Sequence, residues 1–121
     1  MSLSDEKRRA LGAELYQALR SCESVAPFTE RFPNIEIEDA YRISEYMLAE
    51  RLEKDGEKIS GKKIGVTSEP VQKMLGVFQP DFGFLTDAME YPNGASVTIA
   101  GNLISPRAEA EIAFLLKEDL Q

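Results

Sequence analysis

Two glutamates separated by one residue, Glu109 and Glu111, are the pattern with the most chemical potential in this sequence. In a β-strand, residues i and i+2 point to the same face, so the two carboxylates would lie together, roughly 6.7 Å apart. In an α-helix they would point about 200° apart and share no ligand. Taken alone, the pattern also fits a solvated strand face or a helix, and Ala, Glu and Leu around it favour a helix by propensity.

The residue types that are scarce limit the chemistry further. The sequence has no histidine and a single cysteine, Cys22. This composition excludes nucleophile–histidine pairs and zinc sites built from Cys and His clusters. An all-oxygen site of paired carboxylates favours Mg²⁺ or Mn²⁺ instead. A single cysteine forms no disulfide within one chain, so a reducing, cytoplasmic location is expected.

Length and charge indicate the class of protein. The 121 residues are 43% hydrophobic and 29% charged, which is typical of one compact globular unit, and the formal net charge is −7. The acidic residues are spread along the chain and there is no basic stripe, so no nucleic-acid partner is expected. The longest unbroken apolar run, Ile112–Leu116, is far shorter than the roughly 20 residues of a membrane helix, so no membrane partner is expected either.

The N-terminal part predicts two helices that fold back on each other. Ser4 is a candidate N-cap, and Leu11, Leu15 and Leu19 recur every fourth residue. After an irregular link marked by two prolines, a second amphipathic helix is expected over about 38–54, and Gly56 is a candidate stop. The pattern changes to a β-rich one near residue 57, so we expect a helical region over 1–57 and a β-rich region over 58–121.

The second region predicts short strands around one short helix. Strands are expected over 58–67, 82–85 and 95–99, with a helix from Ser68 to Gly76 and turns at 80–81 and 92–94. A last strand is expected over 107–116. Its glutamates would share one face with Arg107, and the opposite face would be apolar, made of the residues Ala108, Ala110, Ile112, Phe114 and Leu116.

Three motifs occur in a fixed order: Gly61-Lys62-Lys63-Ile64-Gly65-Val66-Thr67-Ser68, then residues 74–86 with Gln79-Pro80-Asp81-Phe82-Gly83, then residues 106–114 with Glu109-Ala110-Glu111. Together they closely resemble the 2-oxopent-4-enoate (2-hydroxypenta-2,4-dienoate) hydratases of the fumarylacetoacetate hydrolase superfamily. The resemblance also extends through Asp39-Ala40-Tyr41-Arg42-Ile43 and the first helix.

The resemblance implies a fold and a set of site residues. The expected fold is α+β, with an N-terminal helical part leading into a mixed β-roll core that is incomplete at 121 residues. Glu109 and Glu111 match the metal ligands of the family, and a third carboxylate ligand would lie beyond Gln121. Lys63 and Asp81 match residues that are expected to act as a linked acid/base pair.

The implied activity is metal-dependent addition of water to 2-hydroxypenta-2,4-dienoate, which gives 4-hydroxy-2-oxopentanoate in the meta-cleavage catabolism of aromatic compounds. The expected partners are this small dienoate, further copies of the chain and the decarboxylase of the same pathway. Two alternatives remain open: a 4-oxalocrotonate decarboxylase, and a truncated, non-catalytic module of the same fold.

Overall fold

The structure is a computed structural model, and it describes residues 2–120. Helix α1 spans Asp5–Ser21 and begins where predicted, because the Ser4 hydroxyl accepts a hydrogen bond from the Lys7 amide at 3.2 Å. It ends at Cys22, which adopts the left-handed conformation with φ 55° and closes the last turn. Cys22 is half-buried.

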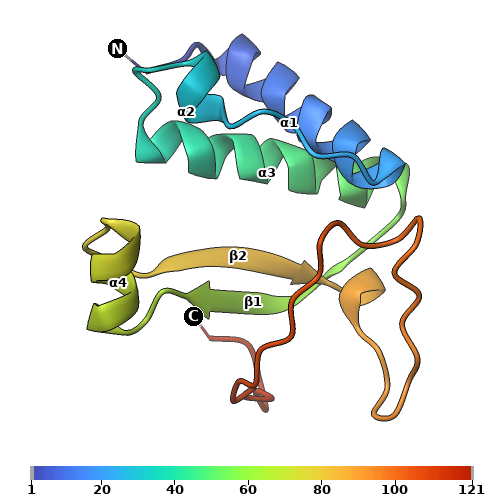
Figure 1. Cartoon of the computed structure of the whole chain (residues 1–121). Coiled ribbons are helices and arrows are strands. Elements are labelled where there is room, and N and C mark those ends of the chain that lie inside the picture. Colours follow the sequence, from blue (N-terminus) through green and yellow to red (C-terminus); the bar gives the residue numbers. More distant parts are fainter. Residues whose placement is uncertain (1, 121) are drawn as a thin grey trace.

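Helix α3 spans Ile37–Lys54 and packs along α1, which confirms the predicted helical hairpin (Figure 1). Leu11 and Ile43 are fully buried between the two helices. The helices approach each other closely at Gly12, where an added Cβ atom would lie 2.5 Å from Tyr46 Cβ. The link between them contains a four-residue helix, α2, at Phe28–Arg31, which the two-proline pattern did not predict.

A two-stranded antiparallel sheet follows the hairpin. Strand β1 spans Ile59–Gly65, strand β2 spans Asp81–Thr86, and helix α4, Glu69–Leu75, connects them. These three elements confirm the predicted strand, helix and strand, and Gly76 ends α4 with φ 69° as expected. The pairing places Lys63 opposite Gly83 and Gly65 opposite Asp81.

The two faces of the sheet have different neighbours. Phe82 stacks on Tyr41 of α3 with ring centroids 4.8 Å apart, so one face is directed towards the helical hairpin. Successive side chains of a strand point to opposite faces of the sheet. Lys63 precedes Ile64, the partner of Phe82, and Asp81 precedes Phe82, so Lys63 and Asp81 belong to the face opposite Phe82. In Figure 1 helices α1, α2 and α3 lie on one side of the sheet, and the C-terminal segment, in red, descends past the strands to the other side.

The expectations for the last third of the chain are wrong in secondary structure. A short 3₁₀ turn, η1, covers Asp87–Met89, and residues 90–120 form turns and irregular chain, although the turn at 92–94 is present. The predicted strands over 95–99 and 107–116 do not form, because neither segment pairs with a strand among the described residues. The predicted apolar face is exposed instead, with Ile112 and Phe114 85% and 86% accessible.

The observed fold is α+β, with a helical hairpin and a small sheet. Within residues 2–120, every helix is too short or too polar to span a lipid bilayer.

Candidate functional site

Lys63, Glu109 and Glu111 come together on the face of the sheet that points away from the helices. The Lys63 ammonium donates hydrogen bonds to Glu111 Oε1 at 2.5 Å and to Glu109 Oε2 at 3.3 Å. The two carboxylates thus converge on one positive charge contributed from more than 40 residues earlier in the chain. The three side chains are about half exposed or more, and we call them the carboxylate–lysine cluster.

The electrostatics of this cluster are those of two carboxylates around one cation. The hydrogen bond to Glu111 is the main reason that the pKa of Lys63 lies above its ordinary value, and the bond to Glu109 adds to it. Partial desolvation acts in the opposite direction. Lys63 is therefore a cation at neutral pH, and it screens the repulsion between the two glutamates.

The backbone around the two glutamates differs from the expected one. Residues 107–111 form no strand, and Ser105, two residues earlier, has a positive φ of 44°. The predicted convergence of Glu109 and Glu111 is nevertheless present, because both side chains turn towards β1. The screening cation is Lys63, whereas the expected strand would have placed Arg107 on the same face as the glutamates.

Asp81 lies on the same face as Lys63, at the start of β2. Both residues line a shallow pocket of about 350 Å³ together with Gly65 and Gly83. Gly65 is the residue that makes room for the Asp81 carboxylate, since a Cβ at position 65 would lie 2.6 Å from Asp81 Oδ1. Lys63 and Asp81 are diagonal neighbours across the two strands, a relation that separates Cα atoms by about 7–8 Å.

The donor set suits a hard divalent cation. Glu109 and Glu111 offer carboxylate oxygens that already meet at one cationic group. Among residues 2–120, no group of three or more His, Cys, Asp or Glu side chains is arranged around one point, so a third protein ligand is not in place there. Mg²⁺ is commonly held by one or two carboxylates, with water and substrate oxygens completing its shell, and the pair fits that pattern.

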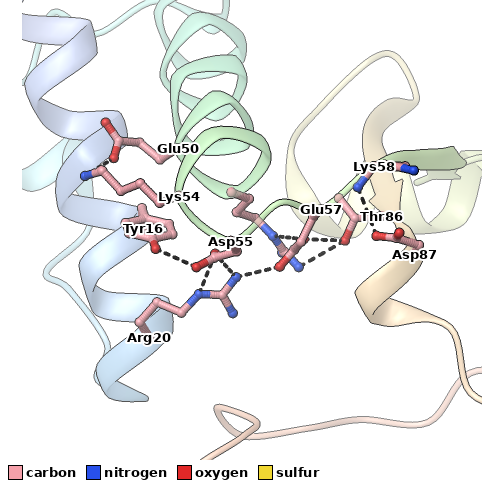
Figure 2. A network of polar contacts seen from close by, with 10 residues as sticks. Tyr16, Arg20, Glu50, Lys54, Asp55, Glu57, Lys58, Thr86 and Asp87 are labelled. Carbon is pink, nitrogen blue, oxygen red and sulfur yellow. Dashed lines mark hydrogen bonds and ion pairs between the residues drawn. The ribbon is translucent and has the colours of Figure 1, made fainter.

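An ion network that was not predicted from the sequence joins the sheet to the helical hairpin, with a buried centre and an exposed end (Figure 2). Arg51 Nε binds Glu57 Oε2 at 2.7 Å, and the Thr86 hydroxyl donates to the same oxygen at 2.6 Å. Arg20 binds the other Glu57 oxygen at 2.6 Å and also pairs with Asp55. Burial raises the pKa of Glu57, but the bonds from Arg51, Thr86 and Arg20 outweigh it and the net shift is downwards.

This network fixes the end of β2 and therefore the sheet that carries Lys63 and Asp81. Thr86 is fully buried, and Arg51 is 6% exposed. Next to it, the Asp87 carboxylate accepts a hydrogen bond from the Lys58 amide at 2.9 Å. No local pattern indicates these contacts, because the partners are up to 37 residues apart and their spacing follows from how the hairpin meets the sheet.

The chain is similar to known proteins in sequence and in structure. No protein-family model matches the sequence. The chain is 61% identical over 111 residues to a 2-hydroxyhexa-2,4-dienoate hydratase of Comamonas testosteroni, covering 91% of the chain and 42% of that protein. It is 60% identical over 110 residues to a 2-hydroxypent-2,4-dienoate hydratase of Pseudomonas putida, covering 91% of the chain and 49% of that protein.

A solved structure is similar as well. The 4-oxalocrotonate decarboxylase of Pseudomonas putida G7, complexed with magnesium and adipate, superposes with a TM-score of 0.66 and 32% sequence identity over 71% of this chain and 32% of that one. The chain spans less than half the length of the hydratases described above. These matches confirm the resemblance that the three motifs predicted: over nine-tenths of its length, the chain is similar to part of the 2-hydroxydienoate hydratases.

Proposed function

We propose that the chain carries part of the catalytic site of a metal-dependent hydratase. The reaction would add water to 2-hydroxypenta-2,4-dienoate and give 4-hydroxy-2-oxopentanoate in the catabolism of aromatic compounds. The main supporting observation is the convergence of Glu109 and Glu111 on Lys63, which lines the same shallow pocket as Asp81. The high identity to two hydratases of such dienoates supports the same activity.

In this proposal Glu109 and Glu111 hold a divalent ion, Mg²⁺ or Mn²⁺. The ion would supply Lewis acidity that stabilises negative charge on the C2 oxygen of the substrate. The decarboxylase of similar structure was solved in complex with magnesium and adipate, and a second structure of it contains calcium and acetate. Lys63 would then no longer neutralise the glutamates and would be free to face the substrate.

Lys63 and Asp81 would move the protons. The 2-hydroxyl group gives up its proton as C5 gains one, which converts the dienol to the 3-enoic 2-oxo acid. Water then adds its oxygen to C4 and a proton to C3, so that one water molecule is consumed for each product formed. An ammonium and a carboxylate on one strand face can hold and accept these protons, and we assign the pair of roles to Lys63 and Asp81 jointly.

Residues 1–57 would serve as a helical region that supports the catalytic region begun by residues 58–121. The protein would act in the cytoplasm as a homo-oligomer and would associate with the decarboxylase of the same pathway. These parts follow from the hydratase resemblance and the single cysteine.

The direct test measures the loss of diene absorbance when purified protein is mixed with 2-hydroxypenta-2,4-dienoate and Mg²⁺. We expect turnover that stops when a chelator is added. Absence of turnover over a range of Mg²⁺ and Mn²⁺ concentrations would overturn catalysis by this chain and favour the non-catalytic module.

A second candidate is decarboxylation of 2-oxohex-3-enedioate. The similarity to 4-oxalocrotonate decarboxylase at a TM-score of 0.66 favours it. Release of CO₂ from that diacid, without hydration of the dienoate, would support the decarboxylase.

A further inference from the structure

A second, larger cavity lies between α3 and the chain that leads into β2. It has a volume of about 550 Å³. Helix α3 contributes Ala40, Tyr41 and Ser44 to its wall, and the segment after α4 contributes Val77 and Phe78. Most of the lining is apolar, and cavities of this size and character commonly receive small molecules.

The two cavities share one wall. Asp81 and Phe82 line both the cavity next to α3 and the shallow pocket that contains Lys63. Asp81 lies at the first residue of β2, where the chain passes from one cavity to the other. Within the larger cavity, Phe82 stacks on Tyr41, and the two rings form part of its apolar lining.

We propose that the larger cavity is the subsite for the distal hydrocarbon end of the substrate, the carbons beyond C4. This inference rests on the proposed hydratase function. A dienoate has one polar end, with the carboxylate and the 2-oxygen, and one end that is purely hydrocarbon. With its polar end at the carboxylate–lysine cluster and its middle carbons beside Asp81, the hydrocarbon end would extend past Asp81 towards Tyr41 and Val77.

The subsite would decide which dienoates the protein accepts. The substrates named for the two similar hydratases differ by one methyl group at the distal end, and the chain is almost equally similar to both proteins, at 61% and 60% identity. Overall identity therefore does not distinguish the two substrates, whereas the size of this cavity can. Burial of one methyl group changes relative reactivity by about four- to tenfold.

The test reduces the cavity from the helix side and compares two substrates. Ala40→Leu adds a side chain to the cavity wall at an exposed position of α3, and Ala49→Leu makes the same change on α3 outside the cavity. We expect Ala40→Leu to lower kcat/KM for 2-hydroxyhexa-2,4-dienoate relative to 2-hydroxypenta-2,4-dienoate by about four- to tenfold. Val77→Ala should shift the same ratio in the opposite direction, and Ala49→Leu should leave it unchanged.

A binding measurement separates this inference from the proposed reaction. Calorimetric titration with saturated 2-oxo acids of five, six and seven carbons, in the presence of Mg²⁺, should show tighter binding with each added carbon. Ala40→Leu should remove this increment. If the increment is found but no dienoate is hydrated, the subsite stands and the hydratase function fails.

Two results would overturn the subsite. One is hydration of dienoates with the same substrate ratio in Ala40→Leu, Val77→Ala and the unaltered protein. The other is a change in sedimentation mass caused by Ala40→Leu without any change in ligand selectivity, which would make the cavity an interface between copies of the chain.

Discussion

At the scale of single residues, the main support for the proposed site is the arrangement of charge around Lys63. Two carboxylates at one point repel each other, and the ammonium of Lys63 offsets that repulsion. Without a cation between them, two surface glutamates would move apart and be fully hydrated. Their convergence on the Lys63 ammonium shows that the two carboxylates can share one cation.

The first prediction concerns these glutamates. Glu109→Gln or Glu111→Gln should lower Mg²⁺-dependent hydration by about 100-fold or more. Mutation of a residue that only hydrogen-bonds to a metal ligand already lowers metal affinity by about 10- to 100-fold, and each of these changes removes a charged ligand itself. Diene absorbance measures the activity, and far-ultraviolet circular dichroism should remain unchanged. Glu118→Gln removes an exposed carboxylate in the same segment and is the control. Full activity in both glutamine variants would contradict the ligand assignment.

The second prediction concerns Gly65. Gly65→Ala places a Cβ atom 2.6 Å from Asp81 Oδ1, so the carboxylate must move away. We expect hydration to fall about tenfold, only part of the roughly 100- to 10,000-fold that a positioned proton-transfer group contributes, because Asp81 is displaced and not removed. The control is Gly61→Ala on the same strand, where the nearest atom to the added Cβ is Leu85 Cδ1 at 3.9 Å. Equal activity of the two variants would show that the position of Asp81 is unimportant.

At the scale of secondary-structure elements, stability depends on how closely α1 approaches α3. Gly12 allows this approach, and Leu11 and Ile43 complete the buried contact. The third prediction is that Gly12→Ala destabilises the protein by about 1–3 kcal/mol through overpacking, despite the higher helix propensity of alanine. Denaturant unfolding measures this, with Gly83→Ala, whose Cβ meets no atom within 4 Å, as the control. A more stable Gly12→Ala protein would disprove the tight contact.

The start of α3 depends on a buried carboxylate. Asp39 accepts hydrogen bonds from the amides of Glu36 at 2.9 Å and Leu3 at 3.1 Å, and from Arg8 Nε at 2.8 Å. The bond from Glu36 is the largest cause that lowers the pKa of Asp39, desolvation opposes it, and Arg8 adds to the lowering. The carboxylate thus ties the N-terminus of α1 to the first turn of α3.

The fourth prediction follows from the sign of that shift. The folded protein binds the Asp39 proton less readily than the unfolded chain, whose pKa is about 3.9. The ionised Asp39 carboxylate therefore stabilises the folded state. Its contribution to the free energy of unfolding is complete above the unfolded pKa and is lost as the pH falls through the lower pKa of the folded protein. Thermal unfolding followed by circular dichroism should therefore show a steep fall in Tm below about pH 4, and Asp39→Asn should flatten it. Glu23→Gln, which removes an exposed carboxylate, controls for the loss of one charge; equal slopes in all three proteins would contradict the prediction.

At the scale of the whole molecule, the helical hairpin and the sheet are joined by the ion network of Arg20, Arg51, Glu57 and Thr86. The other face of the sheet meets the C-terminal segment through Lys63. Beyond these contacts, residues 112–116 expose apolar side chains, and Leu115 is fully accessible. Contiguous exposed apolar residues favour association.

The fifth prediction addresses this segment. The triple substitution Ile112→Ser, Phe114→Ser and Leu115→Ser should reduce concentration-dependent self-association, because it removes the apolar surface that water solvates poorly. Sedimentation velocity from micromolar to near-millimolar concentration measures the mass. The control is Ile99→Ser, at a residue that is 56% exposed outside the segment. If association is unchanged in the triple variant, copies of the chain meet through another surface.

Several features could be predicted from the sequence because their causes are local. Neighbouring residues determine where the helices begin and end: Ser4 caps α1, and α3 and α4 end near Gly56 and Gly76. The leucines at every fourth residue likewise indicate α1 itself. The three motifs likewise indicated Lys63, Asp81, Glu109 and Glu111 as one set. Lys63 and the glutamates do meet, while the catalytic roles remain predictions.

The tertiary structure decided what depends on distant partners. The alternation of residues 107–116 matches a strand, yet a strand forms only where another edge supplies hydrogen bonds, and no such edge pairs with these residues within 2–120. The Arg51–Glu57–Thr86 network and the cavity beside Tyr41 arise in the same way, from contacts between α3 and the sheet. Sequence by itself thus determined the local elements and the chemical character of the site, and long-range packing determined which of those residues face each other.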